Sequence, residues 1–232
     1  MTLDVIIPAL NEEQSIGLVL KCLPAHLIRR IYVCDNGSTD QTATIATQCG
    51  ATVIKEPKKG YGAACLKGLA TIQLAENAPP PDLIAFLDAD FSDAPTQLPL
   101  LLDCLVQNNL DLVLGSRVLG NAEPGSLTPV QRFGNALSTL LIKYLYGYSY
   151  TDLGPFRIIR YHALVQLRML DRDYGWTVEM QVKAAKAKLN VMEVPVHYKK
   201  RIGKSKVSGT LRGIFGAGLK ILFTIFKTYV KG

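Results

Sequence analysis

The fold of this chain is decided by the stretch Leu83-Ile84-Ala85-Phe86-Leu87-Asp88-Ala89-Asp90. Its apolar run follows three prolines at 79–81, and a short apolar run after prolines is typical of a buried strand. Asp88 and Asp90 follow directly, and open α/β sheets bind ligands just beyond the carboxyl ends of their strands. Two carboxylates there favour a hard divalent cation, Mg²⁺ or Mn²⁺, which also takes oxygens from substrate phosphates. The alternative is a pair of solvated aspartates.

Predicted strands and helices alternate on both sides of this run. The strands cover 3–7, 31–34, 51–55, 83–87 and 111–114, and the helices cover about 12–23, 40–49, 60–76 and 95–108. Such alternation indicates a parallel sheet covered by helices on both faces. Polar or glycine residues follow each strand, so one edge of the sheet is expected to collect Asn11, Glu12, Asp35, Asn36, Lys59, Gly60, Asp88 and Asp90.

The second half of the sequence is less regular. Residues 118–129 are rich in Gly, Pro and Asn and are predicted to form a loop. The predictions after it are a helix at 130–148, a tight turn at 152–157, a helix at 178–188 and a strand at 191–196.

Composition indicates a protein with a sizeable core and no disulfide framework. The length of 232 residues fits one large domain or two small ones. Five scattered cysteines indicate buried thiols in a reducing compartment, and three histidines argue against a histidine metal site. The first apolar stretch lacks a basic segment before it, so no signal peptide is expected.

Positive charge is concentrated at the C-terminal end. No acidic residue follows Glu193, whereas nine Lys and Arg residues do. The preceding part holds seventeen basic and nineteen acidic residues, so the formal net charge of +7 belongs to the end of the chain. This asymmetry indicates an anionic partner, such as phosphates, a membrane surface or nucleic acid, or else a solvated basic tail.

Residues 213–230 are predicted to form an amphipathic helix. On a helical wheel Lys220, Lys227 and Lys231 oppose an apolar face. This face consists of Leu211, Phe215, Leu222, Ile225, Phe226 and Tyr229. The pattern is typical of a helix that lies in a membrane interface. A helix that packs on its own domain, with its lysines in water, is the alternative.

Four motifs occur in a fixed order at successive predicted strand ends. They are Ile7-Pro8-Ala9-Leu10-Asn11-Glu12-Glu13, Val33-Cys34-Asp35-Asn36-Gly37-Ser38-Thr39-Asp40, Gly60-Tyr61-Gly62-Ala63-Ala64 and Asp88-Ala89-Asp90. Each alone is explained by a helix cap, a turn or a helix start. Together they resemble the family 2 inverting glycosyltransferases of the GT-A fold, and most closely the polyprenyl-phosphate (dolichyl-phosphate) mannose and glucose synthases. The resemblance extends from Leu3 to about Val207.

The resemblance implies an α/β fold of the GT-A type, with a Rossmann-like nucleotide-binding half and a mixed central sheet. It implies one catalytic domain at 1–207, divided into a nucleotide-sugar half at 1–117 and an acceptor half at 118–207, before the amphipathic helix at 208–232. It further implies a metal-dependent hexosyltransferase that uses Mg²⁺ or Mn²⁺, a UDP- or GDP-linked sugar and a polyprenyl phosphate. We therefore expect a cytoplasmic protein, peripheral on the cytoplasmic face of a membrane, that does not bind nucleic acid.

Site residues follow from the resemblance position by position. The nucleotide-binding residues are Pro8, Ala9, Asn11, Glu12, Asp35, Lys59, Gly60 and Asp88, of which Asp35 meets the base. The metal ligands are Asp88 and Asp90. The catalytic residues are Asp90, Glu179, Arg201 and Lys206, and the acceptor-binding residues are Arg117, Arg132, Asp152, Arg157 and Ser205.

The sequence departs from the family in three places. Asn36 replaces a frequent second Asp, which leaves the choice of base open. Gly154-Pro155-Phe156-Arg157 replaces Ser-Gly-Phe-Arg, which leaves the sugar open. The transmembrane helices of some relatives are absent from this sequence, so a lipid substrate requires the C-terminal helix as an anchor.

The implied reaction is an in-line displacement at the anomeric carbon with inversion, in which a metal and cations stabilise the leaving diphosphate. Loop 199–206, rich in Lys and Arg, is predicted to close over it as a lid. A hydroxyl acceptor needs a base and a lipid phosphate does not, so Glu179 is either that base, an acceptor-orienting group or the partner of a lysine. Two alternatives stay open: transfer to a saccharide hydroxyl, and a sugar nucleotidyltransferase, whose Gly- and Lys-containing first loop is here the acidic 8–12.

Overall fold

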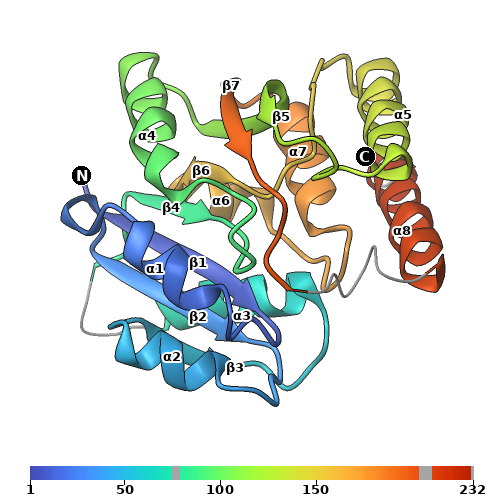
Figure 1. Cartoon of the computed structure of the whole chain (residues 1–232). Coiled ribbons are helices and arrows are strands. Elements are labelled where there is room, and N and C mark those ends of the chain that lie inside the picture. The colour runs from blue at the N-terminus through green and yellow to red at the C-terminus, as the bar shows by residue number, and fades with distance from the viewer. Residues whose placement is uncertain (75–78, 204–210, 231–232) are drawn as a thin grey trace.

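A seven-stranded mixed sheet forms the centre of the protein (Figure 1). The computed structural model describes residues 1–74, 79–203 and 211–230, without the side chains of 211–215. The strands are β1 (Leu3–Ala9), β2 (Arg30–Asp35), β3 (Thr52–Lys55), β4 (Leu83–Phe86), β5 (Leu112–Ala122), β6 (Arg157–Arg160) and β7 (Val191–Tyr198). They are ordered β3-β2-β1-β4-β6-β5-β7, and β6 runs antiparallel to both neighbours, whereas the other pairs are parallel. The predicted α/β fold with a mixed sheet is confirmed.

Helices cover both faces of the sheet. They are α1 (Ile16–Cys22), α2 (Thr42–Gln48), α3 (Tyr61–Gln73), α4 (Leu98–Gln107), α5 (Pro129–Tyr146), α6 (Tyr161–Leu167), α7 (Trp176–Lys186) and α8 (Leu211–Val230), with short 3₁₀ turns at Ala25–Leu27 and Pro95–Gln97. Alternate β1 residues enter two different cores: Val5 and Ile7 pack with α1, α2 and α4, and Ile6 packs with α3 and α7. Both faces of β1 and of β4 are therefore buried, which explains the continuous apolar runs of these two strands.

Two parts of the second half differ from the sequence prediction. Residues 118–122 were predicted as loop, but β5 continues through them and pairs Asn121 with His197. Gly120 makes this possible, because a Cβ there would lie 2.0 Å from Val196 O. The tight turn at 152–157 ends in a strand that was not predicted, β6, which is followed by the unpredicted α6. The arginines at both ends of the Arg-Ile-Ile-Arg segment concealed this central strand.

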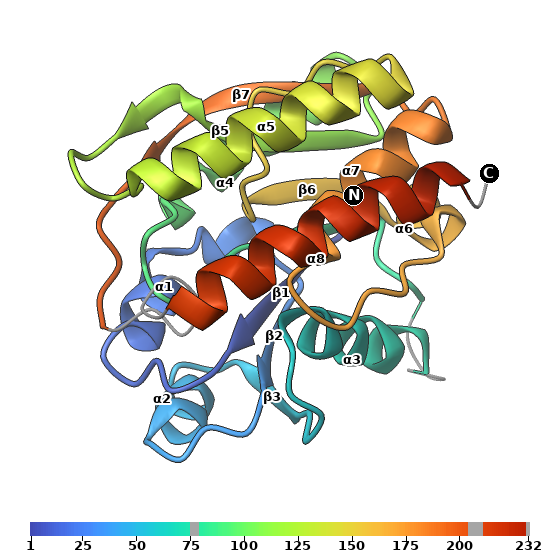
Figure 2. The same ribbon diagram turned by 90° about the vertical axis from the view of Figure 1, so that its right-hand side faces the viewer.

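The C-terminal helix is present and packs on the domain beside α5 and α7 (Figure 2). Ile225 is fully buried, and the hydroxyl of Tyr146 donates a hydrogen bond to Ile225 O at 2.6 Å. Lys220 was predicted to face water, opposite the apolar side of the helix, and this prediction is wrong. Its Nζ lies 3.1 Å from Asp171 Oδ2, on the side of the helix that packs on the domain. In the described part of the chain, no helix is long and apolar enough to cross a membrane.

Candidate active site

The loops after β1 and β2 are tied together by hydrogen bonds at the carboxyl edge of the sheet. Asn11 Oδ1 accepts from Thr39 N at 2.8 Å, and Glu12 N donates to Thr42 Oγ1 at 2.8 Å. Glu12 and Asp35 are both buried at this edge. Pro8 and Ala9 form the buried end of β1, paired in register with the end of β2. The first two motifs thus meet, as predicted.

Asn36 orders the third loop at the same edge. Its Nδ2 donates to Glu56 O at 3.0 Å and to Lys58 O at 2.7 Å, and its Oδ1 accepts from Gly60 N at 2.8 Å. An aspartate cannot donate these two hydrogen bonds, so the Asn at this departure from the family pattern is matched to its surroundings. The loop that Asn36 orders presents Lys59 exposed at the surface.

Gly60 and Gly62 allow α3 to approach a second loop closely. A Cβ on Gly60, whose φ is +138°, would lie 2.0 Å from Arg172 O, and one on Gly62 would lie 2.1 Å from Asp171 O. Ala63 N donates to Arg172 O at 2.8 Å across this contact. Packing of the start of α3 on residues 171–173 therefore requires glycine at both positions.

Three aspartates gather after β4. Tyr61 donates its hydroxyl hydrogen to Asp88 Oδ1 at 3.0 Å, and Ser92 N donates to Asp90 Oδ1 at 2.9 Å. The third is Asp93, which was not predicted as a site residue and whose Oδ2 accepts from Asp88 N at 3.1 Å. Its only signal was its position three residues after Asp90, in a polar turn.

Burial and the repulsion of neighbouring charges raise the pKa values of two of these carboxylates, Asp88 and Asp93. Removal from water, together with the charges of Asp90 and Asp93, holds the pKa of Asp88 well above its usual range. Burial likewise raises the pKa of Asp93 to about 7. Perturbed carboxylates in a polar cluster at a sheet edge are typical of a functional site.

Arg201 reaches these carboxylates from the segment that follows β7. Its Nη2 lies 2.9 Å from Glu12 Oε1, and its Nη1 lies 3.3 Å from Asp90 Oδ2. The backbone holds it there, because Ile202 N donates to Asp90 O at 2.9 Å. The structure thus brings Arg201 to the predicted metal ligand. Ser205 and Lys206 lie outside the described residues, which include only 199–203 of the predicted lid at 199–206.

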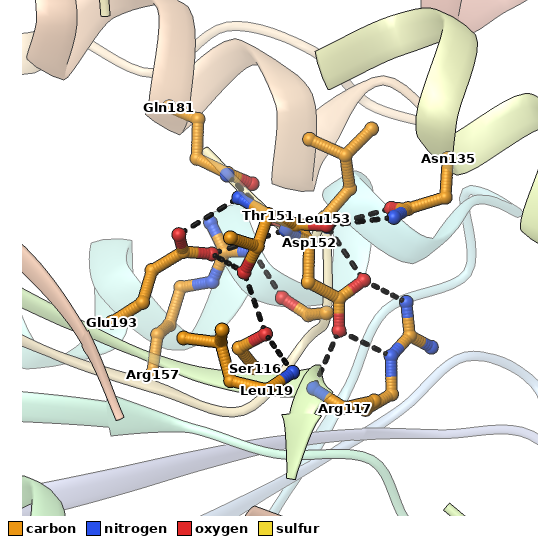
Figure 3. Close-up of polar contacts among 11 residues, drawn as sticks. Ser116, Arg117, Leu119, Asn135, Thr151, Asp152, Leu153, Arg157, Gln181 and Glu193 are labelled. Atoms are coloured by element: carbon orange, nitrogen blue, oxygen red, sulfur yellow. Dashed lines mark hydrogen bonds and ion pairs between the residues drawn. The ribbon is translucent and has the colours of Figure 1, made fainter. Parts of the chain in front are cut away.

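A second polar cluster surrounds Asp152 (Figure 3). Asp152 accepts from Arg117 at three points: the backbone N at 2.8 Å, Nε at 2.7 Å and Nη2 at 2.7 Å. The guanidinium carbon of Arg117 also lies 5.0 Å from the centre of the Tyr198 ring. The backbone of Tyr198 in turn pairs with that of Asp93 in an isolated antiparallel β-bridge. Tyr198 therefore connects the two clusters.

Three residues that the sequence analysis missed hold the backbone of this turn. Glu193 accepts from Thr151 N at 2.8 Å and from Asp152 N at 3.0 Å, while Asn135 Oδ1 accepts from Leu153 N at 2.9 Å. Gln181 donates to Asp152 O at 2.9 Å. These side chains come from β7, α5 and α7 (Figure 3), and no local spacing in the sequence announces their convergence.

Arg157 and Arg132 were also predicted to bind the acceptor, but their surroundings differ from those of Arg117. Arg157 is fully buried, and its guanidinium donates to the carbonyl oxygens of Gly154, Pro155 and Thr177. Burial lowers the pKa of Arg157. Arg132 is exposed near the start of α5.

The carboxylate of Glu179 is engaged in hydrogen bonds and an ion pair with nearby residues. Its carboxylate accepts from Leu170 N at 3.1 Å and from Asp171 N at 2.7 Å, and its Oε1 lies 2.7 Å from Lys183 Nζ. The lysine pairing was one of the predicted alternatives. In the described part of the chain, these hydrogen bonds reach none of the other predicted site residues.

The carboxylates after β4 fit a hard divalent cation that also takes oxygens from a ligand. Asp88 and Asp90 offer only oxygen donors, and among the described side-chain atoms Asp93 Oδ1 is buried without a hydrogen-bond partner. No group of three or more His, Cys, Asp or Glu side chains arranged for a metal occurs in the described ranges. A cation held by Asp88 and Asp90 would therefore complete its coordination with water and with oxygens of a bound ligand such as a diphosphate.

Solved structures with the same architecture identify the fold class of this mixed sheet and its covering helices. Glucosyl-3-phosphoglycerate synthase from Mycobacterium tuberculosis, solved with Mn²⁺ and uridine diphosphate, superposes with a TM-score of 0.75 at 20% identity, over 97% of this chain and 79% of that one. The fold is thus that of the GT-A glycosyltransferases.

Sequence comparison gives the family. The model of the family described as Glycosyl transferase family 2 matches residues 4–172. An uncharacterized glycosyltransferase of Mycobacterium tuberculosis is 40% identical over 90% of this chain and 91% of its own length. A dolichyl-phosphate hexose transferase of Haloferax volcanii is 31% identical over 88% of this chain and 86% of its own length. The chain belongs to glycosyl transferase family 2 and is a glycosyltransferase that uses a nucleotide sugar.

Proposed function

We propose that this glycosyltransferase moves a hexose, with inversion, from a UDP- or GDP-linked sugar to a polyprenyl phosphate. The choice of a phosphate as the acceptor rests on the contacts that the Glu179 carboxylate makes. Transfer to a hydroxyl needs a group that takes up its proton, and Glu179 was the candidate. Its two oxygens instead accept from two backbone N–H groups and from Lys183. A lipid phosphate is already anionic and needs no such base.

On the donor side, Asp35 meets the base, while Pro8, Ala9, Asn11, Glu12, Lys59 and Gly60 line the nucleotide pocket. Asp88 and Asp90 would hold Mg²⁺ or Mn²⁺, which as a Lewis acid would neutralise charge on the leaving diphosphate. Arg201 adds a second positive charge at the same place. Its contact with Asp90 supports this role, since a cation beside the metal ligand is placed to stabilise the leaving group. Lys206 is proposed to join it.

On the acceptor side, Arg117 is the residue that we expect to meet the lipid phosphate. Asp152 and the ring of Tyr198 fix the orientation of its guanidinium. Glu193 and Gln181 fix Asp152 in turn, so the cation is oriented before the acceptor arrives. Arg157 supports the turn by donating hydrogen bonds to the carbonyl oxygens of Gly154 and Pro155. Arg132 and Ser205 complete the proposed acceptor path.

This assignment divides the chain into a nucleotide-sugar half at 1–117, an acceptor half at 118–207 and a C-terminal helix at 208–232. The relative named as a dolichyl-phosphate hexose transferase, with 31% identity, supports a lipid-phosphate acceptor. A lipid acceptor also requires contact with a membrane, which we assign to the cytoplasmic face and to α8.

An acceptor panel tests the proposal. The protein, Mn²⁺ and a set of UDP- and GDP-sugars are incubated with polyprenyl phosphate in detergent, with the dephosphorylated polyprenol, or with 3-phosphoglycerate. We expect release of one nucleoside diphosphate that depends on the lipid phosphate and not on the polyprenol. Release with 3-phosphoglycerate alone would replace the lipid acceptor by a soluble hydroxyl acceptor.

A further inference from the structure

The outer sides of α5 and α8 form one exposed apolar surface, which we call the two-helix face. The two helices lie side by side on one side of the molecule (Figure 2). Exposure reaches 70% for Phe133, 87% for Tyr144 and 68% for Leu219. The face consists of Phe133, Leu140 and Tyr144 of α5 and Leu219, Phe223 and Val230 of α8. Neighbouring members of this set are four or seven residues apart within each helix, which keeps them on one side.

Tertiary contacts fix the outward direction of these side chains. Ile225, on the opposite side of α8, is fully buried, and its carbonyl oxygen accepts from Tyr146. The rings of Tyr146 and Tyr229 stand edge to face with centres 5.8 Å apart, which joins α5 to α8. Because α8 is docked by this side, rotation that would bury Phe223 would also expose Ile225. The packing of α8 on the domain therefore fixes the two-helix face as an exposed surface of the folded protein.

A cationic groove of about 550 Å³ adjoins this face between α7 and α8. Its basic lining consists of Arg172, Lys183, Lys186, Lys220 and Lys227, beside Leu170 and Phe223. The acids in it, Asp171 and Glu179, are already paired with Lys220 and Lys183. Arg172 is exposed and has no ion-pair partner within the described ranges. Lys227 Nζ lies 5.6 Å from the centre of the Phe223 ring, at the border between groove and face.

We propose that the two-helix face docks on an anionic lipid bilayer and that the α7–α8 groove takes the phosphate of a lipid headgroup. Neither α5 nor α8 contains an acidic residue, so every charged side chain on these two helices is positive. Apolar side chains between lysines are the composition that inserts into an interface of anionic lipids. The proposal deepens the membrane contact proposed above: it adds α5 and a headgroup site, and it places apolar side chains outward where the sequence placed lysines.

The charges around the two-helix face also favour an anionic bilayer over a second copy of the chain as its binding partner. A two-fold dimer through this face would bring the same surface of each copy together. Lys227 and Lys143, both exposed, and Arg172 would then meet cations of the partner, and like charges at an interface oppose association. An anionic bilayer instead complements them.

Vesicle binding of the full chain tests the proposal. Co-sedimentation is measured at low salt with vesicles of phosphatidylcholine alone and of phosphatidylcholine with 30% phosphatidylglycerol. We expect at least tenfold tighter binding to the anionic vesicles, lost at high salt. Phe133→Asp with Phe223→Asp should lower binding at least tenfold, and Arg172→Gln with Lys227→Gln should lower it several-fold only for anionic vesicles. The matched controls Val106→Asp and Lys21→Gln, exposed on α4 and α1, should bind as the native protein does.

Two results overturn the inference. One is native protein that ignores anionic vesicles, or face variants that bind as tightly as the controls. The other is a native dimer that Phe223→Asp converts to a monomer without a change in vesicle binding, since this assigns the face to a second copy. The acceptor panel in detergent reports separately on the proposed reaction: transfer without vesicle binding removes only this inference, and vesicle binding without transfer removes only the lipid acceptor.

Discussion

Arg201 Nη1 lies 3.3 Å from Asp90 Oδ2, so the predicted leaving-group cation contacts the predicted metal ligand directly. Arg201 also holds Glu12 at 2.9 Å, which spans the first and fourth strand ends with one guanidinium. A metal bound to Asp90 would compete for this carboxylate, so we expect donor binding to shift Arg201 toward the diphosphate.

Removal of this cation should therefore slow the reaction. We predict that Arg201→Ala lowers kcat about 10²- to 10³-fold, as loss of one preorganised charge at a developing anion does. Lys21→Ala, at an exposed residue of α1 outside the proposed site, is the control and should retain full activity. Steady-state kinetics with the preferred nucleotide sugar measures both, and an Arg201→Ala enzyme within twofold of native would refute the role.

Glu179→Gln separates a structural carboxylate from a catalytic base. The amide would face the N–H groups of Leu170 and Asp171 with one acceptor fewer, which should lower the free energy of unfolding by about 1–3 kcal/mol. The shape of the pH–rate profile should stay the same. Loss of one limb of that profile, or a 10²-fold drop in kcat with unchanged stability, would instead identify Glu179 as the base and favour a hydroxyl acceptor.

Asn36→Asp should destabilise the fold although it restores a residue frequent in the family. The new carboxylate would face the carbonyl oxygens of Glu56 and Lys58, which now receive hydrogen bonds. Leaving these acceptors beside a charge should cost about 1–3 kcal/mol. Urea unfolding measures the change, with exposed Asn121→Asp as the matched control. Equal stability of the two variants would contradict the role of Asn36.

Asp93 should make stability depend on pH. Burial raises its pKa from 3.8 to about 7. Between these values the folded state binds a proton that the unfolded state has lost, so this group's contribution to stability falls as pH rises through the window. Asp93→Asn removes that contribution. Relative to the native protein, the variant should gain stability from pH 4.5 to 7.5 in urea unfolding with EDTA, and parallel curves for the two proteins would exclude the raised pKa.

The first half of the fold was predictable because each apolar run ends in polar residues that mark a strand end. Asp88 and Asp90 follow β4 directly, and Glu12 follows β1, so local spacing alone placed them at one edge. Arg201 was assigned from the family pattern, and its contact with Asp90 needed the structure.

The remainder depends on contacts between distant residues. Glu193, Asn135 and Gln181 converge on the turn at 151–153 from three elements, and nothing local marks them. Similarly, α8 is apolar over much of its circumference, so the helical wheel did not reveal that Ile225 would be buried and Phe223 exposed. Which apolar side docks is decided by its partners, not by the helix.

Transfer of labelled hexose to a lipid phosphate tests the central claim most directly. Native protein, polyprenyl phosphate and a labelled nucleotide sugar are incubated with Mn²⁺ or with EDTA, and label is counted in the organic phase. We predict Mn²⁺-dependent formation of an acid-labile hexosyl-phosphate lipid, at least 10²-fold reduced in Asp90→Asn and unchanged in Asp103→Asn, whose side chain is exposed on α4. Lipid product formed equally in EDTA or by Asp90→Asn, or labelled product only in the aqueous phase with a hydroxyl acceptor, would contradict the account.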